Sequence, residues 1–324
     1  MVSSEIIRNV LSTAFHSAEL PLGNKISGKV RDWYDLNDKE RLIVTTDRLS
    51  AFDKVLAKIP FKGQVLNQLS AWWFAETEHI VQNHMLSTPD PNAMIVKQAT
   101  PFPIEVIVRG YITGVTSTAL WKRYSLGERE IYGYTFPDGL QKNQKLEKAI
   151  VTPTTKDGPT GHDERLTCAE VIDNGLLPED IWQETMHTAL ELFEFGQQKA
   201  RQAGFILVDT KYEFGYDENG KLILIDEIHT PDSSRFWKAD TYQQRLLEGK
   251  EPDGFDKESI RMAYIGKGYQ GEGSIPELDD DLFIKSSQNY IHSYEMLSGR
   301  TFILGEYPVN DRLIHNLQLC GVLS

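Results

Sequence analysis

The segment 209–226 constrains the fold most strongly, because its sequence alone predicts a β-hairpin. Two largely apolar runs, 209–216 and 222–226, flank the dipeptide Asn219-Gly220. Asn-Gly between such runs is a strong short-range hairpin signal, and it favours a two-residue turn in which both central residues have positive φ. In that register Glu218 faces Lys221, and Glu213 faces Asp226.

The two facing carboxylates predict a metal site. Directly opposite side chains have Cβ atoms about 5 Å apart, and at an effective dielectric near 20 the repulsion would cost about 3 kcal/mol. A divalent cation between them reverses the sign, and an all-oxygen site suits Mg²⁺ that is partly held by substrate phosphates. We therefore expect Glu213 and Asp226 to bind Mg²⁺, and Glu213→Gln to leave the metal-free fold equally or slightly more stable. The alternatives are side chains that point into solvent, or a longer turn whose shifted register separates the two.

Charge and cysteine usage limit the classes of partner. The 324 residues include 47 acidic and 34 basic side chains, a net charge of −13, which argues against nucleic acid or an anionic membrane as the main partner. The two cysteines, Cys168 and Cys320, form no disulfide framework and are expected to be buried apolar filler in a reducing compartment. No signal peptide or membrane-spanning run is evident, so we predict a cytoplasmic protein.

The order of helical and strand patterns indicates an α+β protein of two lobes. We expect residues 1–105 to form a mostly antiparallel β lobe and residues 106–324 an α+β lobe. Helices are expected within 1–20 and over 64–84, 179–203, 239–247 and 285–298; strands over 25–36, 41–46, 93–98 and 104–112; and an irregular segment over 119–165.

A glycine-flanked basic segment near the N-terminus could bind phosphate. Lys29, Arg31 and Trp33 would share one face of a strand, next to Gly28. The Gly-x-x-x-x-Gly-Lys spacing is present, but Val30 replaces the Ser/Thr of the nucleotide-binding loop and a strand follows, so that motif is rejected. The alternative is a solvated strand face.

Two further segments could hold an anion. Arg109 ends a very apolar strand, where a guanidinium binds a planar oxyanion or makes a structural salt bridge. Residues 152–156 and 161–163 combine hydroxyls, Lys156 and His162, which suits an anion loop or a plain surface loop. His162 has no partner at metal-ligand spacing, so zinc is not expected.

The segment after the hairpin resembles an anion clamp. The segment Asp232-Ser233-Ser234-Arg235 follows the hairpin strand that ends at Asp226. Lys211 lies on the same strand face as Asp209 and Glu213, within reach of the predicted metal. Because the neighbourhood is already acidic, a phosphate or carboxylate clamp is favoured here over a surface turn.

Taken together, five segments resemble the signatures of the phosphoribosylaminoimidazole-succinocarboxamide (SAICAR) synthases of purine biosynthesis. They occur in the family's order and span most of the chain from 25 to 237. They are Gly28–Asp32, Asp47–Asp53, Val108–Gly114, Asp209–Gly215 and Asp226–Trp237.

The resemblance implies an ATP- and Mg²⁺-dependent ligase with a two-lobed fold related to protein kinases and ATP-grasp enzymes. Its expected reaction joins L-aspartate to the imidazole carboxylate CAIR, giving SAICAR, ADP and phosphate. By matching position, it implies Mg²⁺ at Glu213 and Asp226, ATP at Gly28, Lys29, Arg31 and Glu105, CAIR at Arg109, Ser234 and Arg235, and catalytic roles for Asp209, Lys211 and Arg235.

One segment departs from the family pattern. Many members have Thr-Gly-Ser followed closely by Trp, whereas this chain has Thr113-Gly114-Val115 and reaches a tryptophan only at Trp121. Ser117 or Thr116 would supply the missing hydroxyl to the substrate. Oligomeric state is not predicted.

Two rival functions use some of the same residues. A small-molecule kinase on this scaffold would use the same Mg²⁺ hairpin without an amine acceptor, although the His-Arg-Asp and Asp-Phe-Gly motifs of protein kinases are missing. A nucleotide-binding regulatory module would bind ATP whether or not the carboxylate pair is intact.

Overall fold

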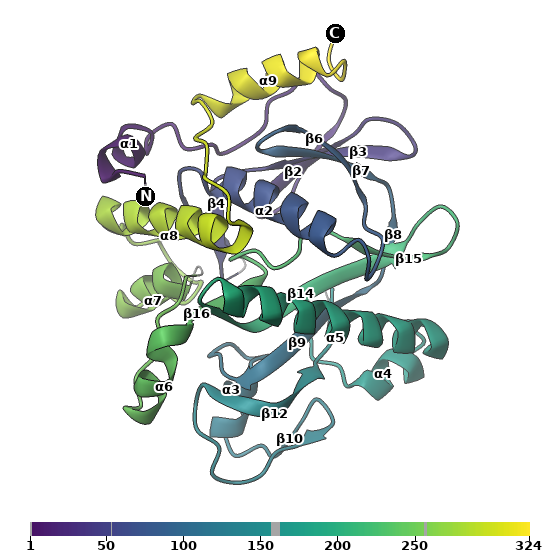
Figure 1. The fold of residues 1–324 in the computed structure, drawn as a ribbon, viewed down its shortest axis with the longest axis vertical. Helices are drawn as coiled ribbons and strands as arrows, with labels where there is room; N and C mark the ends of the chain where they lie inside the picture. Colours follow the sequence, from purple (N-terminus) through teal and green to yellow (C-terminus); the bar gives the residue numbers. More distant parts are fainter. Residues whose placement is uncertain (1, 53, 157–162, 256–257) are drawn as a thin grey trace.

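An antiparallel sheet of five strands forms the N-terminal part of the fold (Figure 1). The structure, a computed structural model, describes residues 2–52, 54–156, 163–255 and 258–324. The sheet order is β1 (Lys25–Ser27), β2 (Arg31–Asp35), β3 (Glu40–Thr45), β7 (Ala93–Lys97) and β6 (Met85–Asp90). A separate hairpin, β4 (Arg48–Ala51) with β5 (Lys54–Lys58), lies beside it.

A second, larger sheet is built around strand β14 (Phe205–Tyr216). Antiparallel to β14 run β9 (Ile104–Ile112), β15 (Leu222–Ile225), β16 (Ser234–Lys238) and the short β8 (Thr100–Pro101). Strands β12 (Gln144–Val151) and β13 (Thr154–Thr155) extend the sheet through β9. Since most of β14 is buried, its sequence is nearly continuously apolar except at the site residues.

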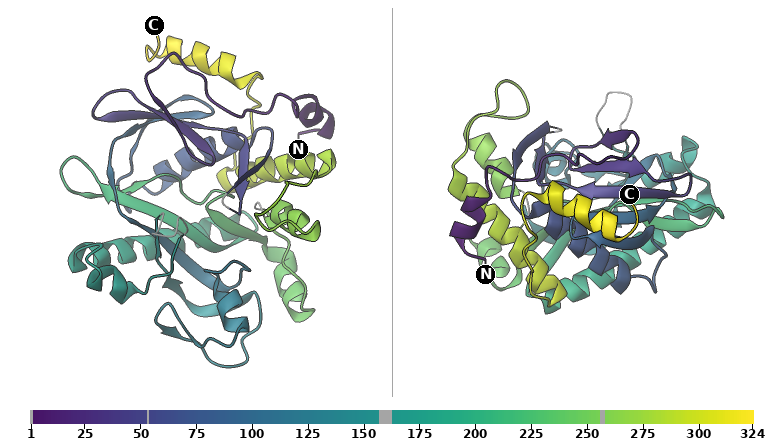
Figure 2. Two further views of the ribbon diagram at one scale, coloured as in Figure 1. Left: turned by 180° about the vertical axis from the view of Figure 1, so that it is seen from behind. Right: turned by 90° about the horizontal axis from the view of Figure 1, so that it is seen from above.

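Helices cover these sheets and join them. Helix α5 (Glu179–Gln202) lies across the large sheet, and α2 (Lys62–Glu76) packs against α8 (Asp280–Ser298) between the two sheets (Figure 1). Helix α9 (Val309–Leu319) lies over the five-stranded sheet, which Figure 2 shows from above. The remaining elements are α1 (Ser4–Asn9), α3 (Leu120–Ser125), α4 (Cys168–Asp173), α6 (Ala239–Leu247), α7 (Glu258–Gly266), β10 (Glu130–Ile131) and β11 (Tyr134–Thr135).

Local sequence explains several helix ends. Thr167 caps α4 in a capping box, with its side chain accepting from the Glu170 amide while Glu170 accepts from the Thr167 amide. Asp279 caps the start of α8, and Gly299, with a φ of 68°, caps its end. Gly204 follows α5 with a φ of 78°, a conformation that glycine adopts without steric cost.

One apolar core connects the two sheets. Trp73 of α2, Val106 of β9, Phe193 of α5, Phe214 of β14 and Tyr290 of α8 belong to a single buried cluster. A second cluster joins the five-stranded sheet to α9 through the buried side chains of Tyr34, Leu42, Val44, Leu313 and Leu317. The C-terminal part of the chain therefore returns to cover the N-terminal sheet.

The predicted α+β class, its two lobes and its antiparallel N-terminal sheet are confirmed. The division at residue 105 stays a prediction. Helices α5 and α6 match their expected ranges closely, whereas α2 ends at Glu76 rather than near residue 84. None of the described helices is both long and apolar enough to cross a membrane.

Other expected elements were wrong in detail. The strand expected over 25–36 is two antiparallel strands, β1 and β2, and the expected irregular segment 119–165 contains α3 and the strands β10, β11, β12 and β13. The helix within 1–20 covers only Ser4–Asn9. Cys168 is partly buried, but Cys320 is exposed, so it is not core filler.

Candidate active site

The β14–β15 hairpin has a longer turn than the sequence predicted, and its register is shifted. Glu213 pairs with Ile225, not with Asp226. Asp217 explains the shift, because its Oδ1 accepts hydrogen bonds of 2.8 Å from the amides of Asn219 and Lys221. This favours a three-residue loop in which Gly220 has a φ of 75°.

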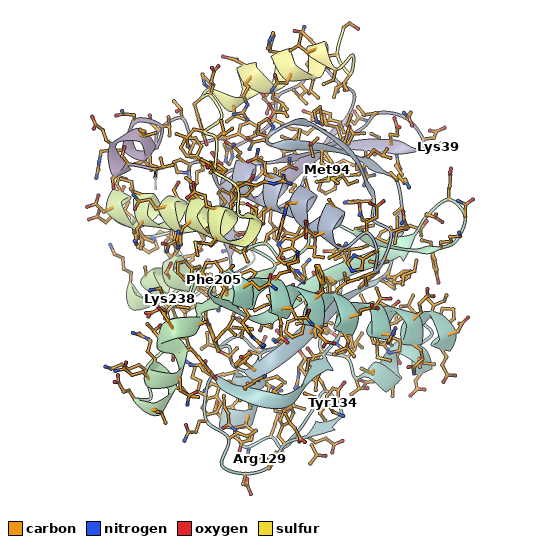
Figure 3. All side chains as sticks on the ribbon, in the orientation of Figure 1. Lys39, Met94, Arg129, Tyr134, Phe205 and Lys238 are labelled. Atoms are coloured by element: carbon orange, nitrogen blue, oxygen red, sulfur yellow. The ribbon has the colours of Figure 1, made fainter. Side chains whose placement is uncertain are left out.

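The expected pair between Glu218 and Lys221 is also replaced. Glu218 accepts instead from Lys39 Nζ at 2.9 Å, and Figure 3 labels Lys39 at the end of the β2–β3 hairpin. Both side chains are largely exposed, so this pair contributes little to stability. It nevertheless places the hairpin tip beside the β2–β3 turn.

Asp226 and Glu213 both lie near Lys211, although they are not cross-strand partners. It follows the last residue of β15 with a φ of 68°, so the chain turns where the strand ends. Lys211 Nζ contacts Glu213 Oε1, Glu105 Oε1 at 3.0 Å and Asp226 Oδ2 at 3.7 Å. Lys156 Nζ contacts the other oxygen of Glu213. The carboxylates therefore converge on ammonium groups, which offset the repulsion expected from sequence.

Arg31 is held by two neighbouring carboxylates, those of Asp226 and Glu227. Its guanidinium contacts Asp226 Oδ1 and lies 2.6 Å from Glu227 Oε2. Burial opposes its charge, but Asp226 and Glu227 outweigh burial and raise the pKa of Arg31. Burial raises the pKa of Glu227, with Arg31 acting in the opposite direction.

Burial and neighbouring charges also act in opposite directions on the pKa values of Lys211 and the carboxylates around it. Burial opposes the charge on Lys211, but Glu213, Glu105 and Asp226 outweigh it and raise its pKa well above the usual value. Burial raises the pKa of Glu105, partly offset by Lys211. Burial likewise opposes ionisation of Asp226, yet Arg31 and Lys211 hold its pKa below its usual range. Asp226 and Lys211 therefore stay charged at neutral pH.

Lys29 does not share a strand face with Arg31 and Trp33, as the sequence had suggested. It is exposed in the turn between β1 and β2. Two hydrogen bonds from the Arg48 guanidinium stabilise this turn. Nη2 donates to the Gly28 carbonyl at 3.0 Å, and Nε donates to the Lys29 carbonyl at 3.2 Å. A Cβ at Gly28 would lie 3.1 Å from the Trp33 ring, so close approach favours glycine.

One carboxylate serves two arginines at the centre of the large sheet. Asp209 on β14 pairs across the strands with Arg109 on β9 and Arg235 on β16. Asp209 Oδ2 contacts Arg235 Nη1 and lies 3.4 Å from Arg109 Nη1, and Thr152 accepts from Arg109 Nε at 2.8 Å. Two guanidiniums and one carboxylate carry a net positive charge.

A cavity of about 310 Å³ opens at this point. Six of the site residues predicted from sequence line it: Glu105, Arg109, Asp209, Lys211, Ser234 and Arg235. The predicted residues Gly28, Lys29, Arg31, Glu213 and Asp226 are not among its described lining residues. Ser117 is exposed and does not belong to that lining either, whereas Thr116 and Thr118 do.

Several lining residues had not been singled out as site residues. Thr118, Thr154, Asp232 and Arg261 contribute to the wall, and Arg261 comes from α7, in a region where the sequence offered no recognisable catalytic residue. Asp232 and Thr154 fall within segments that had been proposed to bind anions, so their position was accessible from sequence. Arg261 joins the site through the tertiary fold, which places α7 at the same cavity wall as Ser234 and Arg235 of β16.

The sequence favours residues 161–163 as part of an anion loop or of a plain surface loop. Gly161 and His162 lie outside the described residues, while Asp163 lines the cavity. Across the described ranges, no three His, Cys, Asp or Glu side chains gather closely enough to hold a metal ion by themselves. A metal bound at Glu213 and Asp226 would take its further oxygen ligands from water or from a substrate.

Comparison with known proteins identifies the family. The profile of SAICAR synthetase matches residues 24–276. The chain belongs to the SAICAR synthetase family. The match includes every segment that carried the resemblance in sequence.

Relatives in this family match over nearly their whole length. The chain is 50% identical over 303 residues to the phosphoribosylaminoimidazole-succinocarboxamide synthase of Legionella pneumophila (strain Paris), covering 92% of this chain and 96% of that protein. It is 46% identical over 314 residues to the chloroplastic synthase of Arabidopsis thaliana, covering 96% of this chain and 76% of that protein.

Solved structures of SAICAR synthetases share the fold. The SAICAR synthase of Saccharomyces cerevisiae complexed with SAICAR has a TM-score of 0.78 at 31% identity, covering 90% of this chain and all of that one. A SAICAR synthetase (Type-2) in complex with ADP has a TM-score of 0.67 at 25% identity, covering 87% of this chain and all of that one.

Proposed function

We propose that this chain joins L-aspartate to the carboxylate of CAIR, with hydrolysis of ATP to ADP and phosphate, to form SAICAR in purine biosynthesis. The carrying observation is that Arg109, Arg235 and Lys211 line one cavity together with hydroxyl-bearing residues. Such a site binds polyanions in a fixed orientation. Membership of the family and the resemblance to structures with SAICAR and with ADP support the same reaction.

Arg109, Arg235 and Ser234 would hold the phosphate or carboxylate of CAIR. The two arginines share Asp209, so their joint charge is only partly neutralised before substrate binds. A guanidinium forms paired hydrogen bonds with a phosphate or carboxylate, which fixes orientation as well as affinity. Thr116 is better placed than Ser117 to supply the additional hydroxyl, because it lines the cavity.

ATP would lie toward the β1–β2 turn, with Gly28 and Lys29 at its phosphates and β9 near Glu105 at its base. Mg²⁺ would be held by Glu213 and Asp226 together with ATP phosphates. Two carboxylates plus phosphate oxygens suit the preference of Mg²⁺ for a few protein ligands. When bound, the ion neutralises charge on the phosphates. Arg31, already held by Asp226, would orient that carboxylate rather than bind ATP directly.

The chemistry requires activation of a carboxylate, because its direct displacement by an amine would expel oxide. An oxygen of the CAIR carboxylate attacks the γ-phosphorus of ATP, the bond to ADP breaks, and an acyl phosphate forms. The uncharged aspartate amine then attacks the acyl carbon and phosphate leaves with the former carboxylate oxygen, while the amine loses a proton to the surroundings. Lys211, Arg235 and Asp209 at the reacting end position the groups and stabilise developing charge.

The decisive test measures ADP release with Mg-ATP and CAIR, with and without L-aspartate, alongside SAICAR formation. We expect aspartate-dependent ADP release matched one-to-one by SAICAR. With CAIR labelled by ¹⁸O in its carboxylate, the label should appear in released phosphate. Unlabelled phosphate would refute the acyl phosphate route.

The same assay separates the rival functions. A kinase would release ADP with CAIR alone and form no SAICAR, and a regulatory module would bind ATP without turnover. We also propose a cytoplasmic location, in keeping with two free cysteines. Chloroplastic relatives show that location varies within the family, so fractionation of the source cells is the test.

A further inference from the structure

A buried lysine lies behind the substrate cavity. Lys62, the first residue of α2, has no solvent-exposed surface. A lysine is rarely buried, and a cation at a helix N-terminus is disfavoured by the helix dipole. Both effects oppose a charge at this position, so a carboxylate is needed to hold it.

That carboxylate is Asp232, in the wall of the cavity. Lys62 Nζ lies 2.7 Å from Asp232 Oδ2, and only 4% of the Asp232 side chain is exposed. The other oxygen, Oδ1, accepts a hydrogen bond of 2.6 Å from the Tyr290 hydroxyl on α8. Both oxygens are therefore used by residues outside the large sheet, which itself supplies Arg109, Lys211 and Arg235.

The two supporting helices are also joined to each other. Ser287 Oγ on α8 donates to the Pro60 carbonyl just before α2 at 2.7 Å, and α2 packs along α8. The Lys62 ammonium lies 5.8 Å from the centre of the Tyr290 ring. Lys62 and Tyr290 thus approach Asp232 from a braced pair of helices.

Hydrogen bonds connect the loop that carries Asp232 to the strand that carries Lys211, so a displacement of Asp232 would also displace residues of the site. The amides of Asp232 and Ser233 donate to Thr230 Oγ1 at 3.2 and 3.3 Å. The Lys211 amide donates to the Ser233 carbonyl at 2.9 Å, and Ser234 Oγ lies 2.8 Å from Thr210 Oγ1. These hydrogen bonds tie residues 230–234 to β14, the strand that carries Lys211.

We propose that Lys62 and Tyr290 are positioning residues, which hold Asp232 and the loop 230–234 in the geometry that binds CAIR. The inference rests on the proposed function in naming CAIR as the ligand. A buried ion pair is a weak source of stability compared with apolar packing, whereas it fixes the position of one loop. Neither residue is among the described residues that line the cavity, so we assign both a positioning role rather than a catalytic one.

The test compares Tyr290→Phe and Lys62→Met with Leu69→Ala, a substitution in the apolar core of α2. We expect both network variants to raise KM for CAIR by about tenfold or more, the scale of a lost charged hydrogen bond, while KM for ATP changes less than about twofold. Leu69→Ala should lower Tm and leave both KM values unchanged. If Lys62→Met does not fold, Tyr290→Phe alone decides, because it keeps the ring and removes only the hydroxyl.

Calorimetric binding of CAIR to the parent protein and to each folded variant tests the inference without turnover. Weaker CAIR binding by Tyr290→Phe, without loss of ATP binding, supports it. Unchanged CAIR affinity in Tyr290→Phe, or equal losses for both ligands in proportion to the fall in Tm, would overturn it. A parent protein that binds CAIR but forms no SAICAR would instead refute the proposed function.

Discussion

Replacing Glu213 with glutamine tests the balance of charges around the proposed metal site. From sequence alone, the substitution would relieve a repulsion and leave the metal-free protein equally or more stable. In the structure, however, Glu213 is mostly buried and contacts Lys211 with one oxygen and Lys156 with the other. The expected sign is therefore reversed, because two attractive contacts are lost.

The size of this loss in stability depends on the contacts that Lys211 and Lys156 keep in the variant. Breaking a buried ion pair costs about 3–5 kcal/mol when the remaining charge has no other partner. Lys211 keeps Glu105 at 3.0 Å and Asp226 at 3.7 Å, and 36% of the Lys156 side chain is exposed to water. Only the charge-assisted hydrogen bonds are lost, and the glutamine oxygen still accepts one. We expect a loss of about 1–2 kcal/mol and a fall in Tm of about 2–4 °C.

The assay is urea unfolding of the parent and of Glu213→Gln in a chelator, followed by SAICAR formation with Mg-ATP. Turnover should fall at least about 100-fold, because Glu213→Gln removes a ligand of the Mg²⁺ that would neutralise charge on the transferring phosphoryl, and losing one such stabilising group costs about this much. Glu218→Gln is the matched control on the same hairpin, since its pair with Lys39 is exposed and should contribute less than about 1 kcal/mol. If metal-free Glu213→Gln were as stable as its parent, the inference that Lys211 and Lys156 stabilise the charge of Glu213 would be refuted.

The remaining predictions concern acid stability, anion binding and the hairpin turn. Because Arg31 helps to hold the pKa of Asp226 below its usual range, ionised Asp226 stabilises the fold above about pH 4 and this contribution is lost as the pH falls further. Arg31→Met should move the acid limb of a pH-dependent unfolding curve to higher pH, and an unmoved limb would contradict the assignment. Arg235→Lys should raise KM for CAIR by about tenfold or more, because one ammonium cannot replace a planar fork; initial rates at varied CAIR measure this, and an unchanged KM would remove Arg235 from the substrate site. In urea unfolding, Asp217→Ala should cost about 1 kcal/mol through two lost backbone hydrogen bonds, whereas Asn219→Ala should cost less than about 0.5 kcal/mol. If Asn219→Ala cost more stability than Asp217→Ala, the result would support the two-residue turn instead.

The sequence identified the hairpin but not its register. Asn219-Gly220 correctly marked the turn, while the Asp217 side chain selected a longer loop that the dipeptide signal does not include. The position of Asp226 close to Lys211 also involves the positive φ of Asp226, where the chain turns at the end of β15. A conformation imposed at one residue by the surrounding structure is not readable from alternating apolar residues.

The cluster around Asp209 was more accessible to sequence reasoning. Arg109, Asp209 and Arg235 each stand out as charged residues in apolar strands, and a charge in such a strand needs a partner. That they are cross-strand neighbours was not deducible, since the order of β9, β14 and β16 in the sheet depends on long-range pairing. Arg261 and Lys62 carried no local signal of a link to this site.

The sequence by itself determined the family, the α+β class and the identity of the charged groups, because these depend on residue types and on their order along the chain. Only the tertiary structure decided which charges neutralise one another and which face the cavity. It paired Arg31 with Asp226 and Glu227, and Lys62 with Asp232. The physical reason is that the energy of a charge depends on burial and on neighbours a few ångströms away, and strand order and helix packing bring those neighbours from distant parts of the chain.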